Sequence, residues 1–240
     1  MPAAWSPLKT VAQSTNKGWD LELDPTQPQN PLTFVSAKGM TWQALAIHPL
    51  PQHTLRPDEV YVRQQDLIAR FGQGPKDQYS FQVDYRLVDV PSPFDLGLEI
   101  WISVQTSLLD TAPKLALTSV GTGTWTSWNH QQLIGDADCV HDDADSGWSG
   151  SQTNARAAVM NTTGECSFVW LVEPRDQVQL QWTCPTTEAK QTAELFGSFL
   201  EKGVIRRARM QLLVSQQKVS LTEIQTAYSQ LRHRELPLTA

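Results

Sequence analysis

Three consecutive stretches decide the fold: EVYVRQQDLIARFG (59–72), QYSFQVDYRLVD (78–89) and LGLEIWISVQTSLL (96–109). In the second stretch apolar residues occupy every other position from Tyr79 to Leu87, and the positions between them are Ser80, Gln82, Asp84 and Arg86. An alternation of period two places the two sets on opposite faces of a strand. The stretches therefore predict three neighbouring antiparallel strands, joined by GQGPKD and VPSPFD, with one apolar face.

A single apolar face needs a second layer to cover it, and in a strand-rich chain that layer is usually another sheet. Further strand patterns lie on both sides of the central stretches: GWDLELD (18–24), LTFVSAKG (32–39), TWQALAIHPLP (41–51), KLALTSV (114–120), FVWLV (168–172) and QVQLQW (177–182). FVWLV is apolar at every position, which favours a central strand. The sequence thus predicts a mainly β protein built as an antiparallel β-sandwich.

The carboxyl-terminal part has a different pattern. TTEAKQTAELFGSFLEKG (186–203) carries Ala189, Ala193, Phe196 and Leu200 at helical spacing, and VIRRARMQLLVS (204–215) alternates like a strand. A capping-box pair, Ser220 and Glu223, then precedes a second helical pattern. We expect one domain, residues 1–240, in which residues 186–240 form a helix-strand-helix extension packed on the sandwich.

Composition narrows the class of partner. The chain has 19 Lys and Arg residues against 25 Asp and Glu residues, a net charge of −6, which disfavours nucleic acid and anionic membranes.

We expect a cytoplasmic protein, since the sequence shows no signal-peptide pattern and no apolar stretch long enough to span a membrane. The cysteines, Cys139, Cys166 and Cys184, have no CxxC spacing and leave at least one thiol unpaired, which fits a reducing compartment.

The irregular segment from Gly121 to Asn154 is the first candidate for function. It is rich in Gly, Trp, Asp and Ser, and it carries Trp125, Trp128 and Trp148, with His130 close behind the first two. A long segment without periodicity is usually functional or disordered. Indole faces beside polar groups suit a sugar, which presents both C–H faces and hydroxyls. The alternative is that these tryptophans anchor a long loop to the sandwich.

The same segment contains the acidic run DADCVHDDADSGW (136–148). Asp143, Asp145 and Gly147 have the D-x-D-x-G spacing of many calcium loops, and Asp142 adds a further carboxylate. A calcium ion would relieve the repulsion among these carboxylates, but the later glutamate of an EF-hand loop is missing. The alternative is a solvated acidic loop. We therefore predict a calcium site at Asp142, Asp143 and Asp145 as one of two interpretations.

Two other features of the sequence indicate structural roles. The histidines of the Pro-rich loop HPLPQHTLRP (48–57) are expected to be ordinary surface residues. Arg206 shares a strand face with apolar residues of the 204–215 stretch and should need a carboxylate partner, for which Asp84 and Glu99 are candidates.

The sequence contains no phosphate-binding glycine loop, nucleophile elbow, zinc-protease motif or dinucleotide fingerprint, so no catalytic residue can be named. The first hypothesis is a non-catalytic binding or accessory protein that uses the Trp-rich segment, with a carbohydrate as the expected ligand. The second is an enzyme acting on a polysaccharide, a hydrolase or lyase with carboxylates as acid and base. The third is a protein-interaction domain that docks a partner through its carboxyl-terminal helices.

Overall fold

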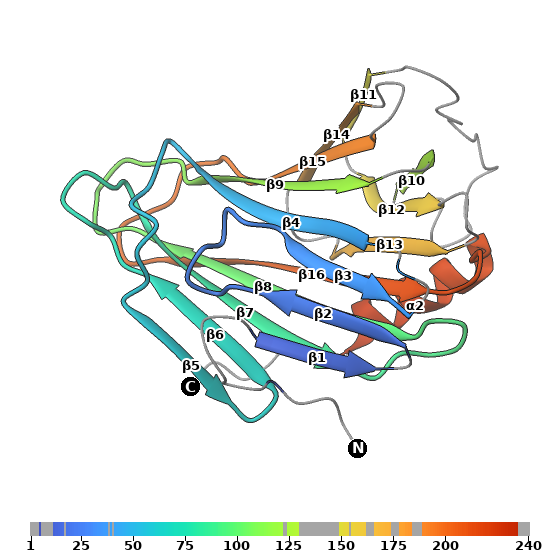
Figure 1. The fold of residues 1–240 in the computed structure, drawn as a ribbon. Coiled ribbons are helices and arrows are strands. Elements are labelled where there is room, and N and C mark those ends of the chain that lie inside the picture. The colour runs from blue at the N-terminus through green and yellow to red at the C-terminus, as the bar shows by residue number, and fades with distance from the viewer. Residues whose placement is uncertain are drawn as a thin grey trace.

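The computed structural model of the chain describes residues 5, 12–16, 18–37, 39, 41–121, 124–129, 149–153, 155–161, 166–173, 178–183 and 189–234. These residues form two eight-stranded antiparallel sheets and a helix, α2 (Leu221–His233). Figure 1 shows the two sheets packed against each other, with α2 on the outside of one of them. The predicted β-sandwich is confirmed. The described residues, α2 included, contain no helix with the length and hydrophobicity that crossing a membrane takes.

Sheet A contains most of the amino-terminal strands. Its spatial order is β1 (Ala12–Asn16), β2 (Trp19–Leu23), β3 (Leu32–Ser36), β4 (Thr41–Leu50), β9 (Lys114–Gly121), β15 (Ala189–Phe196), β14 (Val178–Thr183) and β11 (Ser149–Thr153).

Sheet B contains the central stretches of the sequence. Its spatial order is β10 (Thr124–Asn129), β12 (Ala155–Asn161), β13 (Ser167–Val172), β16 (Ile205–Ser215), β8 (Leu96–Gln105), β7 (Ser80–Val88), β6 (Asp66–Phe71) and β5 (Glu59–Arg63).

The main hydrophobic core lies between the two sheets. The alternation that predicted β7 is borne out, since Phe81, Val83 and Tyr85 are buried there while the residues between them are partly exposed. Aromatic rings join the layers: Trp42 of β4 stacks on Phe168 of β13 with ring centroids 3.9 Å apart. Burial of apolar surface of this kind is the main source of stability of a sandwich.

The first central stretch forms two strands, β5 and β6, where we predicted one. They make a hairpin in which Arg63 pairs with Asp66 across Gln64 and Gln65. Gln64 has φ of 57°, the left-handed conformation that a tight turn between paired strands requires. The hairpin, β7 and β8 are neighbours in chain order and in space.

The face of sheet B that points away from sheet A, here called the outer face, is covered in part by α2. Apolar residues of β12, β13 and β16 form a second core with the buried side of the helix: Ala157, Val159, Val169, Leu171, Leu213, Ile224, Ala227, Tyr228 and Leu231. FVWLV therefore is a central strand, buried on both faces, as predicted. The expectation that the central strands are covered on one side only is wrong for β8, whose residues from Leu96 to Ile102 are all buried.

The first predicted carboxyl-terminal helix is wrong. Residues 189–196 form β15, which pairs with β9 and β14 in the interior of sheet A. The same residues also carry a period of two, with Gln191, Ala193 and Leu195 buried. Pairing with two neighbouring strands outweighs the helical pattern, because tertiary contacts override weak local preference. Residues from 186 onward thus contribute β15 and β16 to the two sheets rather than a helix-strand-helix extension packed on them.

The second predicted helix is confirmed as α2. The Ser220 hydroxyl accepts a hydrogen bond from the backbone N–H of Glu223, and the Glu223 carboxylate accepts one from the backbone N–H of Ser220 at 2.6 Å. This reciprocal pair satisfies amide groups that the first turn leaves without helical partners. The strand predicted at 204–215 is β16.

Candidate functional site

Most of the site predicted from the sequence lies outside the described residues. Trp125 and Trp128 belong to β10, where they pair with Met160 and Ala157 of β12 at one edge of sheet B. The other predicted site residues, His130, Asp142, Asp143, Asp145 and Trp148, are not among those described. The carbohydrate and calcium sites predicted there stay predictions. Within the described part of the chain, no group of three His, Cys, Asp or Glu side chains could hold a metal ion.

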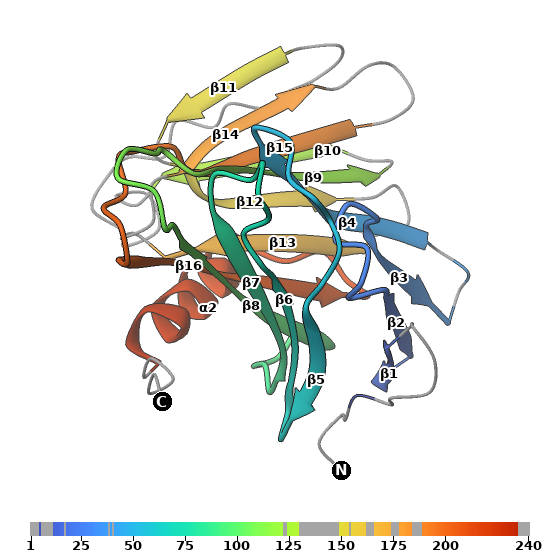
Figure 2. The ribbon, with the colours of Figure 1, turned by 90° about the vertical axis from the view of Figure 1, so that its left-hand side faces the viewer.

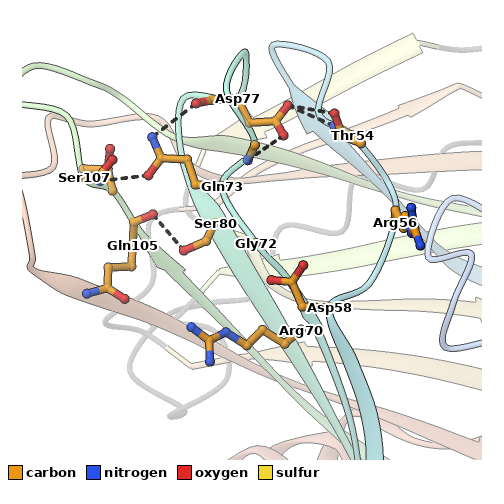
Figure 3. A pocket seen from close by; sticks show the side chains of 12 residues that line it. Thr54, Arg56, Asp58, Arg70, Gly72, Gln73, Asp77, Ser80, Gln105 and Ser107 are labelled. Atoms are coloured by element: carbon orange, nitrogen blue, oxygen red, sulfur yellow. Dashed lines mark hydrogen bonds between the residues drawn. The ribbon is translucent and has the colours of Figure 1, made fainter.

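A polar groove lies at the other end of sheet B, where β6, β7 and β8 meet the loops that precede and join them (Figure 3). Its volume is about 510 Å³, and a second hollow of about 230 Å³ adjoins it, sharing Arg70, Ser80 and Gln105. The second hollow continues over β7, β8 and β16 as far as Arg207. The side chains that line the first hollow are mostly charged, amide or hydroxyl groups: Thr54, Arg56, Asp58, Arg70, Gln73, Asp77, Ser80, Gln105, Thr106 and Ser107.

Asp77 fixes one wall of the groove. Its carboxylate accepts hydrogen bonds from the backbone N–H of Thr54 at 3.0 Å, the Thr54 hydroxyl at 3.4 Å and the backbone N–H of Gly74 at 3.0 Å. Burial by itself would raise the pKa of Asp77, but the hydrogen bonds from Thr54 and Gly74, together with the nearby charge of His53, lower it. Asp77 is therefore a fixed anion that holds two loops together.

His53 lies behind that wall, and its side chain is buried. Its Nδ1 is 2.8 Å from the carbonyl oxygen of Thr54, and its Nε2 is 2.7 Å from that of Tyr79. Both carbonyl oxygens can only accept a hydrogen bond. The Nδ1 atom also lies 3.9 Å from a carboxylate oxygen of Asp77. The expectation that this loop histidine is an ordinary surface residue is wrong.

Two glycines make room for the two carboxylates of the groove. A Cβ at Gly72 would lie 2.1 Å from Oδ2 of Asp58, and a Cβ at Gly74 would lie 2.7 Å from Oδ2 of Asp77. Both distances are shorter than any ordinary non-bonded contact. In the sequence GQGPKD serves as a turn signal; in the structure its glycines also let Asp58 and Asp77 approach the backbone.

The outer face of sheet B carries polar residues in rows across the strands. The pairing of β5 to β8 and β16 aligns Glu59, Arg70, Gln82, Ser103 and Arg207 in one row. The next row contains Tyr61, Ile68, Asp84, Trp101 and Arg209, and the third contains Arg63, Asp66, Arg86, Glu99 and Gln211. Four residues of the first row, Arg70, Gln82, Ser103 and Arg207, line the adjoining hollow, and the other two rows continue that face toward α2.

Asp84 lies in the second row of the outer face, and its pKa is raised. Burial raises its pKa, and the charge of Asp66 raises it further, against the lowering effects of a hydrogen bond from Gln82 and of the charge on Arg207. The Gln82 amide donates to Asp84 at 2.7 Å, so Asp84 adjoins the hollow that Gln82 lines. Carboxyl groups with a pKa perturbed by burial and a neighbouring charge are frequent at functional sites.

Beyond Asp84 the face is closed by α2. Glu99 is buried and accepts hydrogen bonds from the Trp101 indole at 2.8 Å and from Arg234 at 2.8 Å. The Arg209 guanidinium lies over the Trp101 ring and donates to the carbonyl of Leu231 at 2.6 Å, in the last turn of the helix. A cation at the carboxyl end of a helix is favourable because the carbonyls there have no helical partners. These contacts fix the helix against the sheet.

The arginine assignments from the sequence need one correction. Arg206 donates a hydrogen bond to Ser198 and does not pair with Asp84 or Glu99. The deeply buried arginine of β16 is Arg209, whose guanidinium lies 3.8 Å from the Glu173 carboxylate. Arg206 is the second residue of β16 and is half-buried.

The groove residues were missed because no motif joins them. Arg56 and Asp58 lie before β5, Arg70 lies on β6, and Gln105 lies at the end of β8. The signal that could have found them is the polar set Ser80, Gln82, Asp84 and Arg86, which marks the face to search. Finding the partners across that face requires the strand register.

Comparison with known proteins gives a fold and no family. No family model matches the sequence, and no curated protein is similar to it. Similar solved structures include 4-α-glucanotransferase from Thermococcus litoralis, with a TM-score of 0.50, 8% identity, and 89% of this chain and 38% of that chain covered. An α-N-acetylgalactosaminidase, NagBb from Bifidobacterium bifidum, has a TM-score of 0.52 and 14% identity, covering 86% of this chain and 36% of that one.

A protein from Klebsiella pneumoniae named for aldose 1-epimerase activity has a TM-score of 0.50 and 10% identity, covering 96% of this chain and 87% of that one. The chain thus spans little more than a third of the length of the glucanotransferase and the galactosaminidase, but most of the length of the third protein. At these identities the likeness shows the fold alone. The chain has a two-sheet architecture that also occurs in proteins named for chemistry on carbohydrates.

Proposed function

We propose that this protein binds a carbohydrate in the polar groove and does not transform it. The observation that carries the proposal is the groove itself, an open hollow lined by arginine, carboxylate, amide and hydroxyl groups. The fold adds support because the similar solved structures are named for carbohydrate chemistry.

The groove offers the hydrogen-bonding groups that a sugar needs. Each sugar hydroxyl can both donate and accept a hydrogen bond. The groove provides guanidinium donors at Arg56 and Arg70 and a carboxylate acceptor at Asp58. The side-chain amide of Gln105 can both donate and accept. The adjoining hollow adds Arg207. These arginines favour a sugar that carries a carboxylate, sulfate or phosphate, because guanidinium groups bind such anions with paired hydrogen bonds.

A binding role agrees with the hydrogen bonds and the lowered pKa of Asp77, a carboxylate that lines the groove. Asp77 is held by three hydrogen bonds from the protein, and its pKa is lowered, so it is a poor proton donor. Trp125, Trp128, His130 and Trp148 remain predicted contacts of a second binding surface at the Trp-rich segment. Calcium at Asp142, Asp143 and Asp145 remains part of the same proposal, and a calcium titration that shifts neither tryptophan fluorescence nor melting temperature would remove it.

The test is calorimetric titration with neutral oligosaccharides and with uronic-acid or sulfated oligosaccharides of matched length. We expect Arg70→Ala and Gln105→Ala each to weaken binding about tenfold or more, because loss of a hydrogen bond to a charged group costs roughly 1.5–3 kcal/mol and 1.4 kcal/mol is a factor of ten. The matched control is Lys218→Ala, on an exposed loop residue outside the groove. No binding by the unmodified protein, or equal affinity in all variants, would refute the assignment of the groove.

A second candidate function, an enzyme that acts on a polysaccharide, is favoured by Asp84. Burial and the neighbouring Asp66 raise its pKa, as the acid of a carboxylate pair requires. The distinguishing experiment measures release of reducing ends from polysaccharides by the unmodified protein and by Asp84→Asn. Activity that disappears in Asp84→Asn while sugar binding is retained would establish the enzyme, and binding without turnover would establish the first proposal.

The third hypothesis, partner docking through two carboxyl-terminal helices, loses its basis. The first predicted helix is the strand β15, and the apolar residues of α2 are buried against sheet B of the same chain.

A further inference from the structure

The strand β5 forms one edge of sheet B. It is the last strand in the spatial order and pairs with β6 alone among the described strands. All five of its residues are exposed, and they include Val60, Tyr61 and Val62, with 38%, 41% and 40% of their surface accessible. Figure 2 shows β5 beyond β6, at the end of the row that runs through β8, β7 and β6, and in Figure 1 it lies at the lower left margin. An exposed edge of β-branched and aromatic residues is a template for pairing with another strand.

The sequence of β5 is self-complementary when two copies run antiparallel. With Tyr61 at the centre, Glu59 lies opposite Arg63 of a second copy, and Arg63 lies opposite Glu59 of that copy. Val60 and Val62 then lie opposite each other in the same way. Opposite charges and β-branched residues that face each other across strands both stabilise a sheet. We propose that two copies of this chain pair through β5 and join their sheets B into one continuous sheet.

Only this register satisfies both charges. A shift by one residue would place charged residues opposite apolar ones on the other face, because side chains alternate along a strand. A shift by two residues would place Tyr61 opposite either Glu59 or Arg63 and leave the remaining charge beyond the paired region. The pairing centred on Tyr61 is thus set by the residues of β5 themselves.

The proposed pairing also continues a pattern of alternating charge that already exists within one copy. On the outer face Arg86 forms an ion pair with Asp66, and Asp66 lies opposite Arg63 in the β5–β6 hairpin. Across the new boundary Arg63 would meet Glu59 of the second copy, and that residue lies opposite its own Arg70. The row would then read positive, negative, positive, negative, positive without interruption.

This geometry places the two grooves on one side of the dimer. Antiparallel strands side by side are related by a two-fold axis perpendicular to the sheet, so both outer faces point the same way. Arg70, which lines the groove, lies directly across from Glu59 at the boundary. Two grooves on one surface would engage a long or repeating ligand twice. That consequence rests on the proposed function, whereas the dimer itself does not.

The test is sedimentation equilibrium of the full chain, without ligand, over a range of concentrations near 0.1 M salt. We expect a species of twice the 26.8 kDa of one chain. Glu59→Arg and Arg63→Glu should each raise the dissociation constant about tenfold or more, because each places like charges opposite each other at two symmetric positions. The double variant E59R/R63E should restore dimer formation. Glu201→Arg and Arg232→Glu, at exposed residues outside β5, are controls with the same change of charge.

Melting temperatures of all variants verify that each is folded. A monomer at every concentration would overturn the proposal. So would a dimer whose dissociation constant is unchanged in Glu59→Arg, or a double variant as weak as the single ones. Because no sugar is present, failure of the dimer would leave the carbohydrate proposal standing, and failure of sugar binding would leave the dimer standing.

Discussion

Tyr79 joins the two sheets through its hydroxyl group, which makes the substitution Tyr79→Phe informative. The residue precedes β7 of sheet B and is buried. Its Oη donates to the carbonyl oxygen of Lys114 at 2.7 Å and accepts from the backbone N–H of Leu50 at 3.2 Å. Lys114 begins β9 and Leu50 ends β4, both in sheet A. Tyr79→Phe removes both hydrogen bonds and keeps the ring.

The expected loss follows from those two contacts. A hydrogen bond within a protein contributes about 0.5–1.5 kcal/mol, and a buried polar group left without a partner costs about 1–3 kcal/mol. We therefore expect Tyr79→Phe to lower the free energy of unfolding by about 2 kcal/mol. For a chain of this size that corresponds to a fall in Tm of roughly 4–8 °C.

Tyr85 provides the matched control. It is also buried, on the core side of β7, but its hydroxyl makes no hydrogen bond with a described residue, and burial alone raises its pKa. Tyr85→Phe should change stability by less than about 0.5 kcal/mol. The assay is urea unfolding followed by tryptophan fluorescence, with an unchanged dependence on urea concentration. Equal effects of the two substitutions would refute the role assigned to the Tyr79 hydroxyl.

The buried tyrosines also predict an alkaline limit to stability. Burial raises the pKa of Tyr79, Tyr85 and Tyr228, in the last case to about 12. A pKa that is higher in the folded than in the unfolded state gives a contribution that is complete below the unfolded value near 10 and is lost as pH rises through the folded value. The free energy of unfolding should therefore fall above pH about 10, and less steeply in Tyr85→Phe. An equal slope in that variant would contradict this account.

Three further changes test the groove and its supports. Asp77→Asn should destabilise the fold by about 1–3 kcal/mol at pH 7, because an amide cannot accept at both oxygen positions; since the pKa of Asp77 is lowered, the difference from the unmodified protein should shrink as pH falls below about 4 in urea titrations. Gly72→Ala should displace Asp58 and weaken sugar binding measured by calorimetry. Glu99→Gln should remove the charge that holds Arg234 and increase hydrogen exchange of the α2 amides at least about tenfold; unchanged protection would show that apolar contacts alone fix the helix.

The periodic parts of the fold could be predicted from the sequence because each signal was local. The alternation from Tyr79 to Leu87 identified β7, and the pairing of Ser220 with Glu223 identified the start of α2. The stretch that became β15 failed because its residues fit two periods at once. Hydrogen bonding to β9 and β14 decides between those periods, and such pairing is invisible in the segment itself.

The groove could not be predicted because its chemistry depends on register. Asp84 alternates with apolar residues like any exposed strand carboxylate, and nothing in the sequence places it near Asp66. The pairing of β6 with β7 creates that neighbour, because it sets Ile68 opposite Asp84 and Asp66 opposite Arg86. The Trp-rich segment attracted attention because its composition is unusual, whereas the groove is built from common polar residues that four strands bring together.

The carboxyl-terminal helix and the groove are parts of one arrangement on the outer face. The buried charges of Glu99 and Arg209 are stabilised in part by Arg234 and the last carbonyls of α2, in addition to Trp101 and Glu173. Those two charges lie in the same rows as Asp84 and Arg86. The helix α2 therefore supplies partners for the charges at one end of the rows. A second copy paired at β5 would supply partners for the charges at the other end. On this reasoning Glu99→Gln should loosen α2 and leave dimer formation unchanged, whereas Glu59→Arg should weaken the dimer and leave protection of α2 unchanged, because the two boundaries lie at opposite ends of the same rows across sheet B.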